Sequence, residues 1–155
     1  MSRVIDTNVL IVANEKSEQA SEYCMIDCIN MLEQTANLTV ALDQNGLIME
    51  EYQSHCSHKG APGVGDMFFK YLHDNQYCPN NNISLVYINP IDDEMRSFEE
   101  LPPNNFDPSD RKILATAVVA NATVVNATDS DWHEQHELMQ ELNVAVQQLC
   151  PDCFN

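Results

Sequence analysis

Short apolar runs separated by helix-like segments are the feature that most limits how this 155-residue chain can fold. Runs of four or five apolar or β-branched residues predict buried strands, and the segments between them show the apolar spacing of helices. The expected strands are 3–6, 38–42, 84–88 and 122–126, with an edge strand at 144–146. Strands that alternate with helices favour an α/β fold with a parallel sheet covered on both faces.

The expected helices fall between these strands. They are a helical turn at 9–13, a long helix that Ser17 caps, and helices at 47–56, 64–74, 108–121 and 131–142. Gly46, after the second strand, can take the positive φ that a tight turn needs. We expect one domain over residues 1–149, large enough to bury its own core, and a C-terminal tail over 150–155.

Composition bears on the compartment in which the chain works. Apolar residues make up 44% of the sequence, which is typical of a globular core. No apolar run reaches the roughly 18 residues that a membrane span needs, and the start of the chain has no signal-peptide pattern. We therefore expect a cytoplasmic protein without a membrane partner.

The six cysteines are accordingly expected as reduced thiols. Cys24 and Cys28 share one face of a predicted helix and are interpreted as small buried groups. Cys150 and Cys153 have the CxxC spacing of metal ligands, but zinc would need two more. The sequence offers His55, Cys56 and His58 for that role, and a lightly packed tail is the simpler interpretation.

Net charge opposes long-range attraction to nucleic acid. Seven Lys and Arg against 24 Asp and Glu give 7 − 24 = −17. A polyanionic substrate would therefore need local positive groups, a divalent ion or a partner protein. The stretch 52–65 contains no acidic residue and includes His55, His58 and Lys59, which we expect to contact substrate.

Acidic residues follow predicted strands or begin predicted helices at three places. Asp6 ends the first strand. Asp107 suits an N-cap, and Asp110, in the first turn of the same helix, shares the inward side of the apolar residues after it. Asp129 and Asp131 follow the fourth strand. Ligands bind at the carboxyl ends of parallel strands, so a common site is predicted, although capping alone also explains the first three.

A fourth acidic position lies in the helix predicted at 47–56. At about 100° per residue, Glu51 lies at the border of the apolar arc and Glu50 points away from it. Glu51 is therefore the better ligand and Glu50 the better solvated charge, while His55 lies one turn beyond on the same face. Asp43, which ends the second strand, is a further alternative ligand.

Gathering Asp6, Glu51, Asp110 and Asp129 in one place requires a cation. Two unit charges about 4 Å apart repel by roughly 4 kcal/mol at an effective dielectric near 20. A bound dication removes that repulsion, and ligation by oxygen alone suits Mg²⁺ or Mn²⁺. Such ions activate water and stabilise the leaving oxygen in phosphodiester hydrolysis.

The order of these motifs resembles the PIN-domain family of nucleases. The resemblance spans nearly the whole chain and rests on Val4-Ile-Asp-Thr-Asn-Val-Leu10, Ile48-Met-Glu-Glu-Tyr52, Asp110-Arg-Lys-Ile-Leu-Ala115 and Thr128-Asp-Ser-Asp-Trp132. It implies a three-layer α/β/α sandwich with a central, mostly parallel sheet and a metal-dependent ribonuclease site. Many bacterial members of the family are toxins that an antitoxin neutralises, and others process RNA.

The resemblance also implies roles for individual residues. The four catalytic and metal-binding positions would be, in order, Asp6, Glu51, Asp110 and Asp129. Asp131 would be a further metal ligand, because a small shift in alignment exchanges it with Asp129. Thr7 or Asn8 would help to position ligands, and Thr128 or Asp131 would support the last one. Asn8 and Thr128 are also expected to contact the substrate.

The expected function is therefore that of an endoribonuclease dependent on Mg²⁺ or Mn²⁺, with DNA as the other possible substrate. A protein partner such as an antitoxin, or a second copy of the chain, is expected as well. One alternative is a catalytically weak PIN-like subunit that binds a protein partner, as the charge of −17 suggests. Another is a phosphoryl-transfer enzyme, but no second aspartate stands two positions after Asp6 and no GxxxxGK loop is present.

Overall fold

The computed structural model describes residues 2–57, 59–79 and 82–154, so the predicted substrate contact His58 lies outside the described part. The described strands form one five-stranded sheet in the order β3–β2–β1–β4–β5, and every neighbouring pair is parallel. The strands are β1 (Ser2–Ile5), β2 (Thr39–Asp43), β3 (Ile83–Val86), β4 (Thr123–Asn126) and β5 (Val146–Gln148). The predicted parallel sheet is confirmed.

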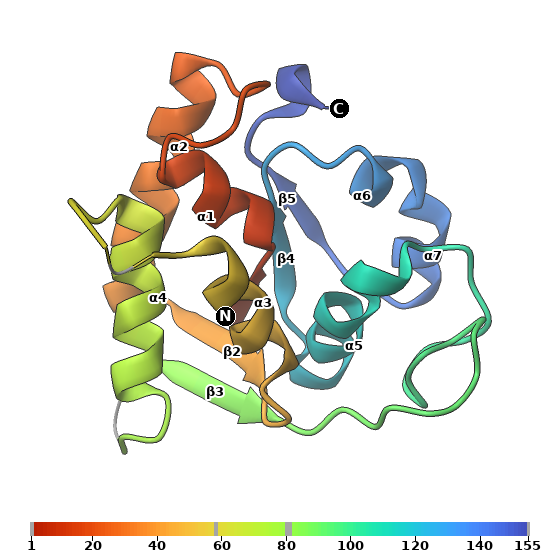
Figure 1. Ribbon diagram of the computed structural model, residues 1–155. Coiled ribbons are helices and arrows are strands. Elements are labelled where there is room, and N and C mark those ends of the chain that lie inside the picture. The colour runs from red at the N-terminus through yellow and green to blue at the C-terminus, as the bar shows by residue number, and fades with distance from the viewer. Residues whose placement is uncertain (1, 58, 80–81, 155) are drawn as a thin grey trace.

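Helices cover both faces of this sheet. The helices α1 (Thr7–Ala13), α2 (Glu22–Glu33) and α4 (Val64–Asn75) lie on one side in Figure 1, and α5 (Arg111–Ala120), α6 (Asp131–Glu134) and α7 (His136–Glu141) lie on the other. Helix α3 (Leu47–His55) contacts α1, α4, α5 and β2. Short 3-10 turns occupy 34–37, 108–110 and 151–153. The fold is a three-layer α/β/α sandwich.

The strand order places a topological switch point beside β1. From β1 the chain adds β2 and β3 on one side, and β4 and β5 then extend the sheet on the other side. Connections that leave neighbouring strands in opposite directions open a crevice at the carboxyl ends of those strands. The topology therefore places the residues that follow β1 and β4 where such folds bind ligands.

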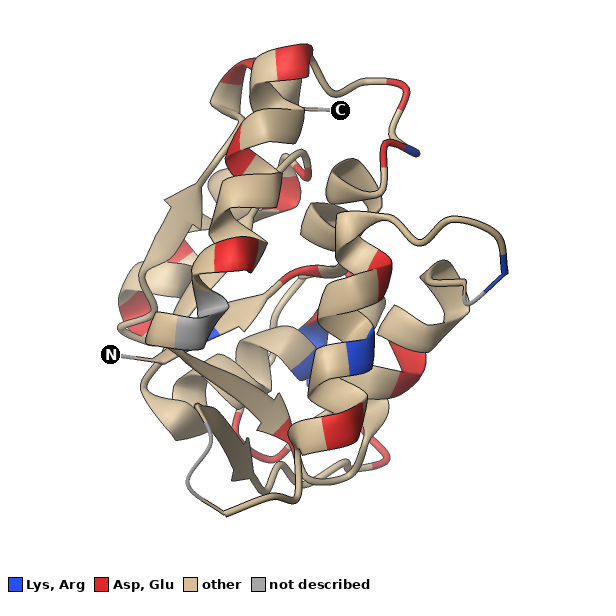
Figure 2. Ribbon diagram, turned by 90° about the vertical axis from the view of Figure 1, so that its left-hand side faces the viewer, with Lys and Arg blue, Asp and Glu red and all other residues tan. Residues whose placement is uncertain are grey.

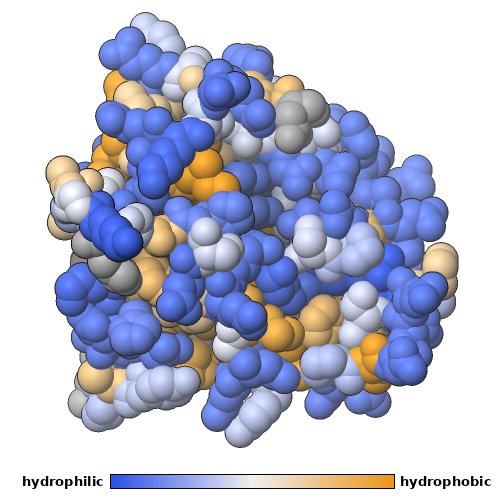
Figure 3. Space-filling model, in the orientation of Figure 1, coloured by the Kyte–Doolittle hydropathy of each residue, from blue (hydrophilic) through white to orange (hydrophobic). Residues whose placement is uncertain are grey.

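The surface is acidic and mostly hydrophilic. Acidic segments are spread over the helices and loops in Figure 2, and the face shown in Figure 3 is largely hydrophilic with a few apolar hollows. Among the described residues, no helix combines the length and apolar character that would carry it through a bilayer.

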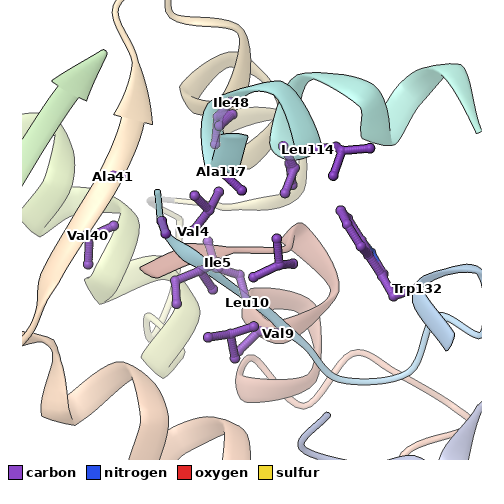
Figure 4. Packing of buried hydrophobic residues seen from close by; sticks show 14 of the residues in the cluster. Val4, Ile5, Val9, Leu10, Val40, Ala41, Ile48, Leu114, Ala117 and Trp132 are labelled. Carbon is purple, nitrogen blue, oxygen red and sulfur yellow. The ribbon is translucent and has the colours of Figure 1, made fainter. Parts of the chain in front are cut away.

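The core fills both faces of the central strand. Val4 and Ile5 are fully buried, and because successive side chains alternate, they point to opposite faces. Figure 4 shows them among apolar residues from the helices of both layers, including Leu10 of α1 and Leu114 of α5. Fully burying such a side chain stabilises the fold by roughly 1.5–3 kcal/mol, so this packing holds the carboxyl end of β1 in place.

Several element boundaries differ from the prediction. Helix α2 is capped by Ser21, whose Oγ accepts a hydrogen bond from the Cys24 N–H at 3.1 Å, and not by Ser17. Both serines are suitable caps, and the start at Ser21 follows a turn in which Glu15 takes a positive φ of 62°. The helix predicted at 131–142 is divided into α6 and α7, and the edge strand lies at 146–148.

A buried arginine holds the long connection between β3 and α5. Arg111 is 4% exposed. Its guanidinium donates to the Glu94 carbonyl at 2.7 Å, the Ser97 Oγ at 3.0 Å, and the Asn104 carbonyl and Oδ1, each at 3.1 Å. Because Arg111 opens α5, this network fixes the loop against the start of that helix, next to Asp110.

The C-terminal tail is tied to the body of the domain by a disulfide. Cys24 of α2 is bonded to Cys150, and both are buried. The prediction that all cysteines are reduced is therefore wrong for this pair, although Cys28, Cys56, Cys78 and Cys153 are free thiols. The two bonded residues are 126 positions apart in sequence, and only the folded sheet brings the end of β5 against α2.

The first prediction concerns the cap of α3. Asp43 is buried, and its carboxylate accepts hydrogen bonds from the Leu47 and Ile48 N–H groups at 2.8 and 2.9 Å. Replacing Asp43 with alanine should lower the free energy of unfolding by about 1–2 kcal/mol, because the cap is lost. Urea unfolding measures this effect, and the exposed neighbour Gln44→Ala is the control. Equal stability of the two variants would contradict this role for Asp43.

Candidate metal site

Asp6 is fixed at the carboxyl end of β1. It caps α1, and its carboxylate accepts a hydrogen bond from the Asn8 N–H at 3.2 Å and another from the Trp132 Nε1–H at 2.5 Å. The side chain is only 4% exposed. Trp132 is itself buried and packs edge-on against Phe106, with ring centroids 4.6 Å apart. This packing anchors the start of α6, and the indole also orients Asp6.

Asp110 and Asp129 face Asp6 from two other segments. Asp110 lies where the 3-10 turn at 108–110 enters α5, and Asp129 follows β4. One carboxylate oxygen from each of the three aspartates lies within 4.8 Å of those of the other two. The structure therefore brings together three of the five predicted metal ligands in one group.

Asp107 and Asp131 extend this cluster. Together with Asp110 they form a second group whose ligand oxygens all lie within 4.8 Å of one another. Asp107 is exposed and accepts hydrogen bonds from the Ser109 N–H and Oγ–H at 2.9 and 2.8 Å, which lower the pKa of its carboxyl. Asp110 therefore belongs to two neighbouring groups of carboxylates, an arrangement with room for more than one cation.

Two asparagines lock the segments that carry the aspartates. The Asn8 side chain donates to Asn126 Oδ1 at 2.8 Å and accepts from the Ala127 N–H at 3.0 Å. The Asn126 amide in turn donates to the Asp129 carbonyl at 2.8 Å and to Gln148 Oε1 at 2.6 Å. Asn8, predicted as a ligand-positioning or substrate-binding residue, thus joins the ends of β1 and β4.

Burial and mutual repulsion favour protons in this cluster. Burial raises the pKa of Asp6 to about 7 although hydrogen bonds from Asn8 and Trp132 oppose the shift, and the charges of Asp129 and Glu51 raise it further. Burial likewise raises the pKa of Asp110 to about 9, with contributions from Asp6 and Asp129. Without a cation, the cluster therefore retains protons at neutral pH.

Glu51 lies beside the cluster with its own partners. The Thr7 hydroxyl donates to Glu51 Oε2, and Lys112 Nζ forms an ion pair with Oε1 at 2.8 Å. Lys112 Nζ also donates to the Ser109 carbonyl at 2.6 Å. Glu50 is exposed, as predicted, while Glu51 is half-buried and close enough to raise the pKa of Asp6. Its carboxylate therefore supports the cluster from the side.

The predicted substrate contacts differ in how far they are exposed to solvent. His55 and Lys59 are exposed, whereas Thr128 is only 4% exposed, so its buried side chain does not fit the predicted contact with substrate. Asp43, the alternative ligand, uses both carboxylate oxygens to cap α3. Of the predicted substrate contacts, His55 and Lys59 are therefore the ones that a substrate can reach at the surface.

The chemistry of the cluster fits a hard divalent cation. Every side chain in the two groups is a carboxylate, and Mg²⁺ and Mn²⁺ prefer oxygen ligands and keep several waters. A thiol-rich or imidazole-rich site would instead favour zinc. The half-exposed positions of Asp110, Asp129 and Asp131 leave the cluster open to solvent on one side.

Comparisons with known proteins do not assign a family. No family model matches the chain, and the comparison with curated proteins finds no match. Membership of the PIN-domain family therefore stays a prediction from the motifs, and the functional argument rests on the site.

Three contributors to the site were not assigned to it from sequence. Asp107 was interpreted as a cap, which it is, but it also lies within the second carboxylate group. Asn126 is fully buried at the end of β4, and a polar residue closing an apolar strand was the only signal. Lys112 follows Asp110 by two positions, and nothing in that spacing indicates that it pairs with Glu51.

The second prediction concerns pH and metal. In the metal-free protein the free energy of unfolding should fall as the pH rises from about 4 to about 9. The reason is that Asp6 and Asp110 titrate at about 7 and about 9 in the native state but near 3.8 when unfolded, so the native state binds protons more tightly. Saturating Mg²⁺ should reverse this trend, because it binds the deprotonated form.

Thermal unfolding of Asp110→Asn provides the matched comparison. In the absence of metal at pH 8 this variant should be more stable than the parent by about 1–2 kcal/mol, a value kept small because the site faces solvent. It should also lose most of the Mg²⁺ stabilisation. If Mg²⁺ stabilises parent and variant equally, the ion only screens the net charge of −17, and the site assignment is wrong.

Proposed function

We propose that this protein is a nuclease dependent on Mg²⁺ or Mn²⁺ that hydrolyses RNA phosphodiester bonds. The supporting observation is the group Asp6, Asp110 and Asp129, whose ligand oxygens lie within 4.8 Å of one another at the carboxyl edge of a parallel sheet. Such a concentration of negative charge destabilises the metal-free fold, and a divalent cation relieves it.

The residues of the cluster have separate roles in hydrolysis. Asp6, held by the Trp132 indole and the Asn8 N–H, is the fixed ligand. Asp110 and Asp129 complete the set from the opposite side, and Asp110 or Asp131 can receive the proton that the attacking water gives up. When bound, the ion lowers the pKa of that water and neutralises charge on the phosphate.

Substrate binding requires positive charge that the surface supplies only locally. Lys112 lies beside the carboxylates through its ion pair with Glu51, and a phosphate that displaces Glu51 would keep it paired. His55, at the end of the same helix as Glu51, and the exposed Lys59 extend this basic edge. We propose that single-stranded RNA enters along it, with DNA as the weaker substrate.

The net charge of −17 supports a protein partner as well. Acidic residues are spread over the helices and loops in Figure 2 and repel a polyanion at a distance, so a basic partner protein would be needed to bring RNA to the site. Such a partner would correspond to the antitoxin or RNA-processing partner that the sequence resemblance implies.

The third prediction is loss of cleavage when the cluster is neutralised. Purified protein should cut a labelled single-stranded RNA with Mn²⁺ or Mg²⁺ and not with a chelator present. Asp6→Asn, Asp110→Asn and Asp129→Asn should each lower the rate by roughly 100-fold or more, because each removes a ligand charge. Glu137→Gln, which removes an exposed charge on α7, is the control and should cleave normally.

The same assay separates the two leading functions. Variants that keep the native circular dichroism spectrum and lose cleavage support the enzyme. A parent protein that binds neither Mn²⁺ nor RNA and cuts no nucleic acid would contradict the proposal and favour a non-catalytic subunit that binds a protein.

The fourth prediction uses the adjacent glutamates as a matched pair. Glu51→Gln should slow cleavage by roughly 10–100-fold, the range typical of residues that support metal ligands from the outer shell. Glu50→Gln changes the same charge on the same helix and should have no effect, because its side chain is exposed. A loss in Glu51→Gln as large as in Asp110→Asn would make Glu51 a direct ligand, and no loss would exclude it from the site.

A further inference from the structure

Four of the six cysteines lie at or near the N-terminal half of α2, away from the carboxylates. The Sγ atoms of Cys24, Cys28 and Cys150 lie within 4.8 Å of one another, and all three residues are buried. The fourth, Cys153, points its Sγ at the Ser21 hydroxyl, 3.6 Å away. Ser21 is the residue that caps α2 and accepts a hydrogen bond from the Cys24 N–H.

The positions of these cysteines in the chain are those of metal ligands. Cys24 and Cys28 are four apart on one helix, so their side chains lie on the same face. Cys150 and Cys153 are three apart, and the 3-10 turn at 151–153 returns the second toward the first. A C-x₃-C pair and a C-x₂-C pair that face each other match the spacing of structural zinc sites, in which four thiolates surround the ion.

The space around these residues also suits a compact ion. A pocket of about 100 Å³ opens between the start of α2 and the tail, and its lining includes Cys24, Cys150, Cys153 and Ser21. In a four-thiolate zinc site each Zn–S bond is about 2.3 Å long, which sets neighbouring sulfurs about 3.8 Å apart. The sulfurs of Cys24, Cys28 and Cys150 lie within 4.8 Å of one another, and Cys153, which lines the pocket with Cys24 and Cys150, is the fourth thiol at this place.

The candidates that the sequence offered for completing a zinc site with Cys150 and Cys153 are different residues. Of these, Cys56 directs its thiol at the Gly65 carbonyl, 3.8 Å away, and His55 is an exposed residue at the end of α3. His58 lies outside the described residues. The folded chain therefore supplies Cys24 and Cys28 as the missing pair.

We propose that Cys24, Cys28, Cys150 and Cys153 bind one Zn²⁺ when the Cys24–Cys150 disulfide is reduced. The disulfide and the zinc ion are then two alternative cross-links at the same place. A dithiol reductant transfers two electrons and two protons, which breaks the S–S bond and leaves two thiols while the reductant forms its own disulfide. Four thiols then release four protons as four Zn–S bonds form. Either cross-link joins the C-terminal tail after β5 to α2.

Cobalt is the most direct probe of this site. Fully reduced protein, kept without oxygen in a phosphine reductant, should bind one Co²⁺ with the thiolate-to-metal charge-transfer band and the visible bands of a tetrahedral thiolate complex. Zn²⁺ should displace the cobalt and remove these bands. The oxidised protein, in which Cys24 and Cys150 are bonded to each other, should show neither band.

Variants then identify the ligands. Cys28→Ser and Cys153→Ser should weaken Zn²⁺ binding by more than the roughly 10–100-fold expected for outer-shell residues. Cys153 is only half-buried, so its replacement should leave the fold intact even if Cys28→Ser does not. Cys78→Ser, which removes an exposed thiol elsewhere, and Asp110→Asn, which alters the carboxylate cluster, should bind zinc like the parent.

Two results would overturn the proposal. One is a reduced parent protein without thiolate-to-cobalt bands. The other is a Cys153→Ser variant that binds Zn²⁺ as tightly as the parent. The nuclease proposal is tested separately, because in that account Asp110→Asn loses cleavage and Mg²⁺ stabilisation while the four cysteines are unchanged.

Discussion

The repulsion among carboxylates at the end of β1 is the constraint on which the rest of the site depends. Asp6 is almost fully buried and faces Asp110 and Asp129. Burial, together with repulsion from neighbouring carboxylates, raises the pKa of Asp6 and of Asp110, so the cluster retains protons at neutral pH when no cation is bound. The hydrogen bond from Trp132 keeps the Asp6 carboxylate from turning away. Rigidity and repulsion together make a site that is less stable empty than filled.

The fold supplies the geometry for this arrangement. All strands of the described sheet are parallel, and β1 and β4 are neighbours although more than a hundred residues separate them. Their ends are joined by the Asn8–Asn126 hydrogen bond, while Arg111 anchors the long loop that leads to Asp110. The three aspartates thus come from separate segments whose positions are each fixed by buried polar contacts, not by the loops alone.

The sequence was most informative where local chemistry decides the structure. The strand and helix alternation predicts the three-layer parallel fold, and the helical arc correctly separates exposed Glu50 from half-buried Glu51. Two kinds of feature could not be predicted from the sequence. Partner choice over long distances, such as Lys112 with Glu51 or Cys24 with Cys150, depends on tertiary packing. Where the chain offers two suitable capping residues, the residue at which the helix starts depends on which choice buries the apolar face of the helix.

Diffraction from crystals grown with Mn²⁺ tests the central claim most directly, because anomalous scattering locates the ion itself. The account predicts an anomalous peak bounded by Asp6, Asp110 and Asp129, with the Asp6 carboxylate still bonded to Trp132. Crystals of Asp110→Asn grown in the same way should lack this peak. Crystals of the parent protein with no peak among the three aspartates, at Mn²⁺ concentrations that saturate ordinary magnesium enzymes, would contradict it.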